Sequence, residues 1–138
     1  MQKKWFGIAL FAVVLFPVLA MAVEPGILKF LEKFHGHTCV GSLMGARLGL
    51  AAKTALETAG GEGKFKAKCF ALTCAVDGVQ VTAGTTYGNK AIEVDDQDQM
   101  RLLLTAEKNG RQVDATLTKL AEEKGKASDL YRPRHPEV

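Results

Sequence analysis

The chain has 138 residues, of which 47% are hydrophobic and 24% are charged, and its 18 Lys and Arg residues against 15 Asp and Glu residues give a net charge of +3. This length suits one domain with its own hydrophobic core, which does not need disulfide bonds for stability. The charge is nearly neutral and no basic cluster is interleaved with aromatic residues, so the composition excludes a protein that binds nucleic acid by neutralising phosphates.

The first 22 residues have the pattern of a secretory signal. "MQKK" is a basic start, "WFGIALFAVVLFPVLA" is apolar, and Ala20-Met21-Ala22 has the small-x-small pattern of a signal-peptidase site. The alternative is a membrane anchor, because the apolar run is near the lower length limit for a span. Pro17 and the cleavage motif favour a cleaved signal. We therefore expect a periplasmic or secreted protein without a membrane anchor, whose single domain comprises residues 23–138.

Two helices are predicted after the signal. Apolar residues at helical spacing over residues 24–34 indicate a short amphipathic helix that delivers Phe34 to the core and ends at a His-Gly-His turn. A longer helix is predicted over residues 41–59, in which glycine recurs every four residues. An interior glycine costs about 1 kcal/mol relative to alanine. The stripe therefore indicates close approach of another backbone, either a strand or a helix of a second subunit.

The stretch "KFKAKCFAL" alternates apolar residues with lysines, which predicts a strand with one face in water. Cys69 falls on the apolar side, as a buried small hydrophobic residue. A weak helix follows over residues 73–84, "KAIEV" indicates another strand, and "KLAEEKGKA" indicates a final helical turn.

Asn109-Gly110 predicts a β-hairpin with a two-residue turn, in which Leu102 faces Leu117. In chain order, the elements are helices, a strand, a helix and then three antiparallel strands. They predict an α+β domain with an α-β-α-β-β-β core, in which N-terminal helices pack on one face of a small, mainly antiparallel sheet.

His35, His37 and Cys39 stand within five residues, although the chain has only three histidines and three cysteines. Imidazole and thiolate are ligands that Zn²⁺ and other late first-row divalent ions accept, and a fourth ligand must come from elsewhere. Cys39 and Cys74 both fall at or near a predicted helix N-terminus, where the helix dipole favours the thiolate. Cys74 is therefore the candidate fourth ligand, with Asp77 as a carboxylate that binds the metal or orients one of its ligands.

Each of these residues also has a purely structural interpretation. One histidine can cap a helix while the other is solvated, Cys39 can be a buried apolar residue, and Asp77 can accept hydrogen bonds from free backbone N–H groups at the start of its helix. Tyr87 and Asn89 follow a glycine-rich turn, and they either line the site or only complete the turn. His135 lies in a proline-flanked tail and is expected to be solvated.

Two motifs, "FHGHTCVGSLMGARLGLAA" and the later "CAVDGVQVTAGTTYGNKAIEV", resemble the family of the E-type subunit of formylmethanofuran dehydrogenase, whose core domain carries Phe-His-Gly-His-x-Cys-Pro-Gly and then Cys-Ala-Val-Asp-x-x-Gln. The resemblance spans nearly all of the expected mature chain. It implies an α+β core like that of the catalytic domain of glyceraldehyde-3-phosphate dehydrogenases, a homodimer, and a metal near the His/Cys motif. By position, the family's cluster maps onto His35, His37, Cys39 and Cys74, with Asp77 beside them.

The sequence departs from the family's pattern in a few places. Val40 replaces the usual proline, which removes no ligand, and Thr85 stands where many relatives carry a cysteine, which implies one thiol fewer. "TTYGNKAI" lacks the usual Gly-Lys-Gly-Asn order, which puts an anion-binding role of that loop in doubt. No cysteine follows Cys74 in this sequence, so we expect a core domain without the cysteine-rich zinc finger of longer members.

Two functions remain open. In the first, the exported protein holds one divalent transition metal, with Zn favoured, and either delivers it to a partner protein or acts on a small-molecule substrate, with Asp77 as the catalytic residue that orients a bound water. In the second, Cys39 and Cys74 form a reversible disulfide in a thiol redox protein. The absence of a Cys-x-x-Cys motif counts against the second function, and the oxidising compartment supports it.

Overall fold

The computed structural model describes residues 23–130 of the chain. The predicted signal segment and the tail that carries His135 lie outside the described residues. The described elements are, in order, α1 (Pro25–His35), α2 (Val40–Thr58), β1 (Phe65–Cys69), α3 (Ala75–Ala83), β2 (Ile92–Val94), β3 (Arg101–Ala106), β4 (Gln112–Thr116) and α4 (Lys119–Lys126). This is the predicted α+β class. None of the helices in residues 23–130 is both long and apolar enough to cross a membrane.

The four strands form one mixed sheet in the order β2-β1-β3-β4. β1 pairs antiparallel with β3, and β3 pairs antiparallel with β4, as predicted for most of the sheet. The expectation that β2 is also antiparallel was wrong, because β2 pairs parallel with β1 at the edge of the sheet. The reason is α3, which connects the two strands and returns the chain to the same end of the sheet, as a parallel pair requires.

The hairpin between β3 and β4 has a longer loop than predicted. Leu102 lies opposite Ala115 rather than Leu117. The loop contains four residues, 107–110, and the N–H of Gly110 donates to the carbonyl of Ala106 over 2.8 Å. Gly110 has a φ of +70°, which glycine adopts without strain. A shift of two positions keeps every side chain on its predicted face of the sheet.

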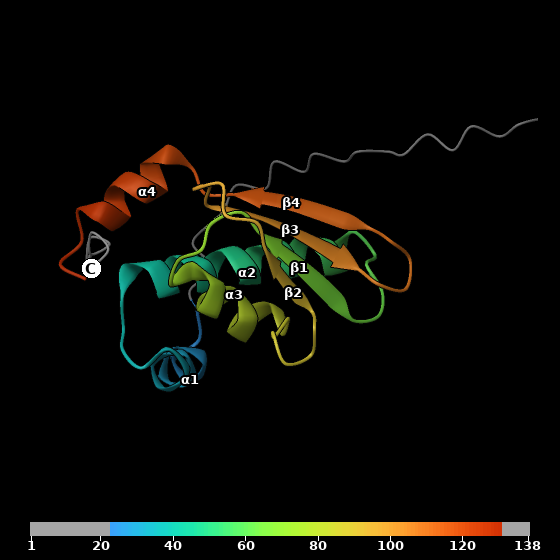
Figure 1. The fold of residues 1–138 in the computed structure, drawn as a ribbon, viewed down its shortest axis with the longest axis horizontal. Coiled ribbons are helices and arrows are strands. Elements are labelled where there is room, and N and C mark those ends of the chain that lie inside the picture. The colour runs from blue at the N-terminus through green and yellow to red at the C-terminus, as the bar shows by residue number, and fades with distance from the viewer. Residues whose placement is uncertain (1–22, 131–138) are drawn as a thin grey trace, which may run out of the picture.

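The core lies between the sheet and the two central helices, α2 and α3, which pack on one face (Figure 1). Leu56 of α2 and Leu102 and Leu104 of β3 are fully buried there. Burying one such leucine side chain contributes about 1.5–3 kcal/mol to folding. Along β1, Ala67 and Cys69 are buried and the lysine between Phe65 and Ala67 is exposed, as the alternating pattern predicted.

The glycine stripe of α2 packs against α3 of the same chain. A Cβ atom on Gly45 would overlap the backbone of Ala75, and one on Gly49 would overlap the hydroxyl of Thr82. Gly78 of α3 makes the reciprocal approach to the backbone of α2. The sequence had predicted a strand or a helix of a second subunit as the partner of this stripe. That prediction was wrong, because the partner is α3 of the same chain. It brings two helix backbones together and with them the two helix N-termini.

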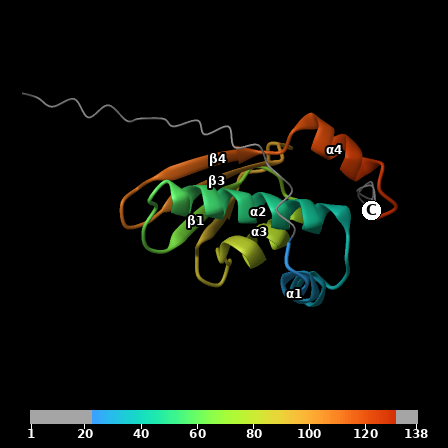
Figure 2. The ribbon, with the colours of Figure 1, turned by 180° about the vertical axis from the view of Figure 1, so that it is seen from behind.

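The helix α1 packs on α2 and α3 through Leu31, which is only 2% exposed. Phe34 was predicted to enter the core, but its side chain is 46% exposed and stacks on Phe30 at 6.2 Å between ring centroids. Ile27 and Leu31, four residues apart, form the inward stripe, and the two phenylalanines form the next stripe around the helix. Seen from either side, α1 and α4 flank the N-terminal end of α2 (Figures 1 and 2).

Candidate metal centre

Two cysteines occupy the N-cap positions of the neighbouring helices α2 and α3, and the side chain of Cys39 accepts a capping hydrogen bond. Cys39 is the N-cap residue of α2, with extended backbone angles, and Cys74 is the N-cap residue of α3. A Cβ atom on Gly41 would lie 3.0 Å from the Cβ of Cys74 and 3.9 Å from the Sγ of Cys39. The close glycine packing of the two helices therefore places both thiols at the same point, where the helix dipoles favour negative charge.

His35 is the last residue of α1 and completes the cluster. Gly36 follows it with a φ of +89°, so the chain turns sharply after the histidine. The Nε2 atom of His35 lies 3.5 Å from the Sγ of Cys39. One ligand atom each from His35, Cys39 and Cys74 lies within 4.8 Å of the others, which makes this trio a candidate metal site in the described chain.

Asp77 holds the imidazole of His35 in place. His35 Nδ1 lies 2.6 Å from the Oδ2 of Asp77, and Gln80 donates from Nε2 to the Oδ1 of Asp77 over 3.2 Å. A carboxylate on Nδ1 selects the tautomer whose proton is on that nitrogen, so the lone pair of Nε2 faces the thiols. Asp77 is the third residue of α3, as predicted, but its side chain binds His35 rather than capping the helix.

The thiol of Cys39 lies in surroundings that favour its thiolate. Burial alone raises its pKa, but hydrogen bonds with the side chain and backbone of Ser42, with Cys74 and with His35 outweigh burial and lower the pKa below its usual value. The N–H of Ser42 donates to the Sγ of Cys39 over 3.4 Å. Cys39 is therefore the thiol that carries negative charge most readily.

The other two cysteines differ from Cys39. Burial, followed by the charge of Cys39 and a hydrogen bond with it, raises the pKa of Cys74. Burial alone raises the pKa of Cys69 to about 11. Cys69 is thus a buried apolar residue on β1, as predicted, and takes no part in the cluster.

The imidazole of His35 gains a proton more easily than usual. Burial lowers its pKa, but hydrogen bonds with Asp77 and Cys39, together with their charges, raise it by more.

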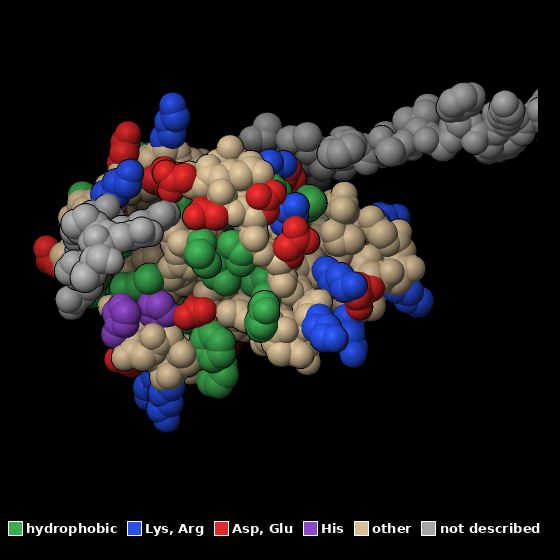
Figure 3. All heavy atoms as spheres, viewed as in Figure 1, with side chains coloured by type: hydrophobic (Ala, Val, Ile, Leu, Met, Phe, Trp, Pro, Cys, Tyr) green, Lys and Arg blue, Asp and Glu red, His purple; other side chains and the backbone are tan. Residues whose placement is uncertain are grey.

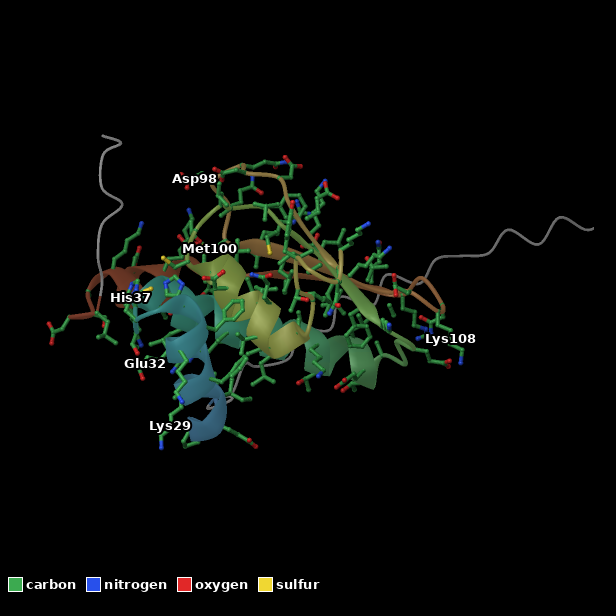
Figure 4. All side chains as sticks on the ribbon, turned by 60° about the horizontal axis from the view of Figure 1, so that its bottom comes forward. Lys29, Glu32, His37, Asp98, Met100 and Lys108 are labelled. Carbon is green, nitrogen blue, oxygen red and sulfur yellow. The ribbon has the colours of Figure 1, made fainter. Side chains whose placement is uncertain are left out.

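His37, the fourth predicted ligand, lies beside the trio but outside it. It is exposed, and its ring centroid is 4.6 Å from that of His35 with a tilt of 39°. The two imidazoles lie side by side on the surface (Figure 3), and His37 stands at the site end of α1, while Glu32 and Lys29 follow along the helix away from it (Figure 4). His37 also lines a groove of about 240 Å³ between α1 and the start of α2. A small molecule or a protein partner can therefore reach this edge of the site.

The Thr85–Asn89 segment does not contribute side chains to the site. Thr85 follows the C-terminal end of α3, whereas the cluster is at the N-terminal end, about 13 Å away for nine helical residues. Its hydroxyl is buried without a hydrogen-bond partner among the described residues. Tyr87 is 80% exposed, and Asn89 is exposed as well. A side chain at position 85 is therefore remote from this trio.

Sequence reasoning missed two residues of the site, Ser42 and Gln80. Ser42 stands three positions after the N-cap Cys39, which is the spacing at which a cap accepts from a backbone N–H. Gln80 stands three positions after Asp77 on α3, close enough for a side-chain pair on one helix face. Both signals are present in the sequence, and Gln80 is also the last residue of the Cys-Ala-Val-Asp-x-x-Gln motif, but neither the spacing nor the motif assigned it a contact.

The spacing of one pair in the trio suits a tetrahedral transition metal. With Zn–N near 2.0–2.1 Å and Zn–S near 2.3 Å, adjacent nitrogen and sulfur ligands lie about 3.6 Å apart. The observed separation between His35 and Cys39 is 3.5 Å. One imidazole and two thiolates are the donors that such ions prefer, and the carboxylate behind the imidazole is the outer partner that ligating histidines usually have.

The family model described as FmdE, molybdenum formylmethanofuran dehydrogenase operon, matches residues 34–135. The chain belongs to the FmdE family. The matched region begins just before the His/Cys motif and includes every residue of the trio. A search of curated proteins found no match. Within the matched region, this chain has a His/Cys/Cys group that could hold a metal ion.

Proposed function

We propose that this FmdE-family chain is an exported metal-binding protein that holds one divalent transition metal through His35, Cys39 and Cys74. The observation that supports this most strongly is the Asp77–His35–Cys39 series, in which a carboxylate fixes an imidazole whose other nitrogen faces a thiol capped by a backbone N–H. The contacts of Asp77 with His35 and of His35 with Cys39 orient the imidazole as the outer partner of a metal-ligating histidine does.

Zinc is the metal we propose. Two thiolates and one imidazole form a soft to borderline donor set, which disfavours Mg²⁺ and Ca²⁺, and zinc accepts this set in tetrahedral geometry without redox chemistry. An ion bound here would supply charge stabilisation and a polarised water where its coordination is open. Asp77 uses both oxygens on His35 and Gln80, which favours a role in holding the ligand rather than in orienting a water.

Whether His37 binds the metal distinguishes a carrier from a metalloenzyme. As a fourth ligand on an exposed turn, it would close the site and could release the ion to a partner that docks at the groove edge. We favour this carrier function. A coordination position open to water at His37 would instead suit a small-molecule substrate.

Export is proposed from the sequence of residues 1–22, whose basic start, apolar run and Ala-x-Ala motif are those of a cleaved signal. The intact mass of the protein recovered from the cell envelope tests this proposal. A chain that starts at Val23 is expected, and a chain that retains residues 1–22 would contradict export by cleavage.

The metal site is tested by elemental analysis of protein purified without chelator, together with zinc titration of single variants. About one metal per chain is expected. His35→Ala, Cys39→Ser and Cys74→Ser should each lose it, because each removes a ligand. Cys69→Ala is the matched control, since it removes a thiol outside the trio. Metal content that is unaffected by Cys39→Ser and Cys74→Ser would contradict the site.

A thiol redox function is the second candidate, supported by the hydrogen bond between Cys74 and Cys39. In this function, the Cys39 thiolate attacks a disulfide of a partner, Cys74 resolves the mixed disulfide, and the partner leaves with two thiols while an internal disulfide forms. A titration that finds one free thiol in the oxidised protein and three after reduction would favour this function. Three free thiols with bound metal would favour the carrier.

A further inference from the structure

We propose that Gln80 is a positioning residue that sets the tautomer of His35 and thereby the metal affinity of the site. Gln80 lies on α3, three positions after Asp77, and does not belong to the trio. It connects Asp77 to the backbone of the loop that follows α3. This inference rests on the proposed metal site and adds a residue that the site needs.

The direction of the hydrogen bonds is decided at the loop. The backbone N–H of Tyr87 can only donate, and it donates to the Oε1 of Gln80 over 2.9 Å. The amide of Gln80 therefore has to present its NH₂ group to Asp77. Asp77 Oδ1 accepts that hydrogen bond, which leaves Oδ2 to accept from the Nδ1 of His35. The lone pair of His35 Nε2 is then directed at Cys39.

The donor at the start of this series is held firmly. The loop closes on itself through the N–H of Lys90, which donates to the carbonyl of Tyr87 over 2.9 Å, and the N–H of Ala91, which donates to Thr86 over 3.1 Å. The carbonyl of Ala91 in turn accepts from Ala67 of β1 over 2.8 Å. The Tyr87 amide is thus fixed to the sheet, and its side chain can remain exposed without affecting this role.

The backbone of the loop after α3 fixes the orientation of the Gln80 amide, although the side chains of that loop do not reach the site. If the amide of Gln80 were free to rotate, its oxygen could face Asp77 and its NH₂ could face solvent, and the carboxylate would lose a donor. Asp77 would then hold His35 less firmly, and the second tautomer, with the proton on Nε2, would be populated. That tautomer has no lone pair to offer to a metal on the side of the thiols.

The test uses the full mature chain with Gln80→Met, which keeps the length and helix propensity of the side chain but removes both hydrogen bonds. Nitrogen NMR of the histidine rings in metal-free protein reports the tautomer of His35, and a competition titration reports zinc affinity. Gln80→Met is expected to shift His35 toward the tautomer with the proton on Nε2 and to weaken zinc binding, by less than the about 10–100-fold that loss of the direct partner of a ligating histidine costs. Gln112→Met, which removes an exposed hydrogen bond between β4 and Thr105, is the matched control and should change neither.

A second variant, Gln80→Asn, keeps the amide but is too short to join Asp77 to the loop, and the same two changes are expected. A wild-type tautomer and wild-type zinc affinity in a folded Gln80→Met protein would overturn the proposal. The tautomer is measured without metal, so this outcome is distinct from failure of the proposed function, in which the wild-type protein itself binds no zinc. If Gln80→Met does not fold, the result for Gln80→Asn decides.

Discussion

His35 and Asp77 are 42 positions apart in the sequence, yet Nδ1 of one lies 2.6 Å from Oδ2 of the other and joins the end of α1 to the first turn of α3. No hydrophobic contact requires this pairing, because both residues are partly exposed. The pairing depends on the close packing of α2 on α3 and on the turn that the chain makes at Gly36. The pairing therefore links the fold to the proposed chemistry.

Replacing Asp77 with alanine should weaken zinc binding about 10–100-fold, because removal of the outer partner of a metal-ligating histidine typically costs that much. Competition with a chromophoric chelator measures the affinity. Asp114→Ala is the control, since it removes a half-exposed carboxylate on β4 that pairs with Arg101 and does not belong to the trio. Equal zinc affinity of Asp77→Ala and Asp114→Ala would show that Asp77 does not support a metal ligand.

The three cysteines should react with iodoacetamide at different rates. Both Cys39 and Cys69 are buried, but the lowered pKa of Cys39 and the raised pKa of Cys69, about 11, should make Cys39 react faster in metal-free protein near neutral pH. Peptide mass spectrometry at timed intervals follows each site. Saturating zinc should protect Cys39 and Cys74 together. Modification of Cys69 at the rate of Cys39 would contradict the structure.

Replacing Gly45 with alanine should destabilise the protein by about 1–3 kcal/mol or more, because the added methyl group overlaps the backbone of α3. It should also weaken metal binding, since α3 carries Cys74 and Asp77. Urea unfolding and zinc titration measure the two effects. Gly26→Ala in α1 meets no atom within 4 Å, and it should be neutral or stabilising by up to about 1 kcal/mol. Similar free energies of unfolding for both variants would contradict the packing of α2 on α3.

The Arg101–Asp114 pair predicts a small dependence of stability on pH. A hydrogen bond from Arg101, opposed in part by burial, lowers the pKa of Asp114 in the folded chain. A lowered folded pKa means that the stabilisation is present above the ordinary pKa of an aspartate and is lost as the pH falls through the folded value. Because Asp114 is 39% exposed, the contribution is at most about 1 kcal/mol. The difference in unfolding free energy between wild type and Asp114→Asn should shrink from pH 7 to pH 3, and a constant difference would contradict this assignment.

Much of the fold follows from local patterns in the sequence. The α+β class and the alternation along β1 were predicted correctly, because helix periodicity, strand alternation and turn residues act over short distances. The hairpin register was wrong by two positions because Asn109-Gly110 suits a two-residue turn and also the end of a four-residue loop. The partner of the glycine stripe and the burial of Phe34 depend on how whole helices pack, and no local pattern determines that.

The trio was predicted for a different reason. His35 and Cys39 stand close together in a chain with few histidines and cysteines, and the match to Cys74 came from the family resemblance together with a helix N-terminus. Ser42 and Gln80 were missed because their roles depend on distances across the fold. His37 lies next to the trio, and its service as a ligand remains a prediction.

X-ray absorption at the metal edge of the zinc-loaded mature chain tests the central claim most directly, because it counts sulfur and nitrogen neighbours of the ion without a crystal. We expect two sulfur ligands at about 2.3 Å and imidazole nitrogen at about 2.0–2.1 Å. We also expect the loss of one sulfur in Cys74→Ser. A shell of only nitrogen and oxygen, or a sulfur count that Cys74→Ser leaves unchanged, would contradict binding at His35, Cys39 and Cys74.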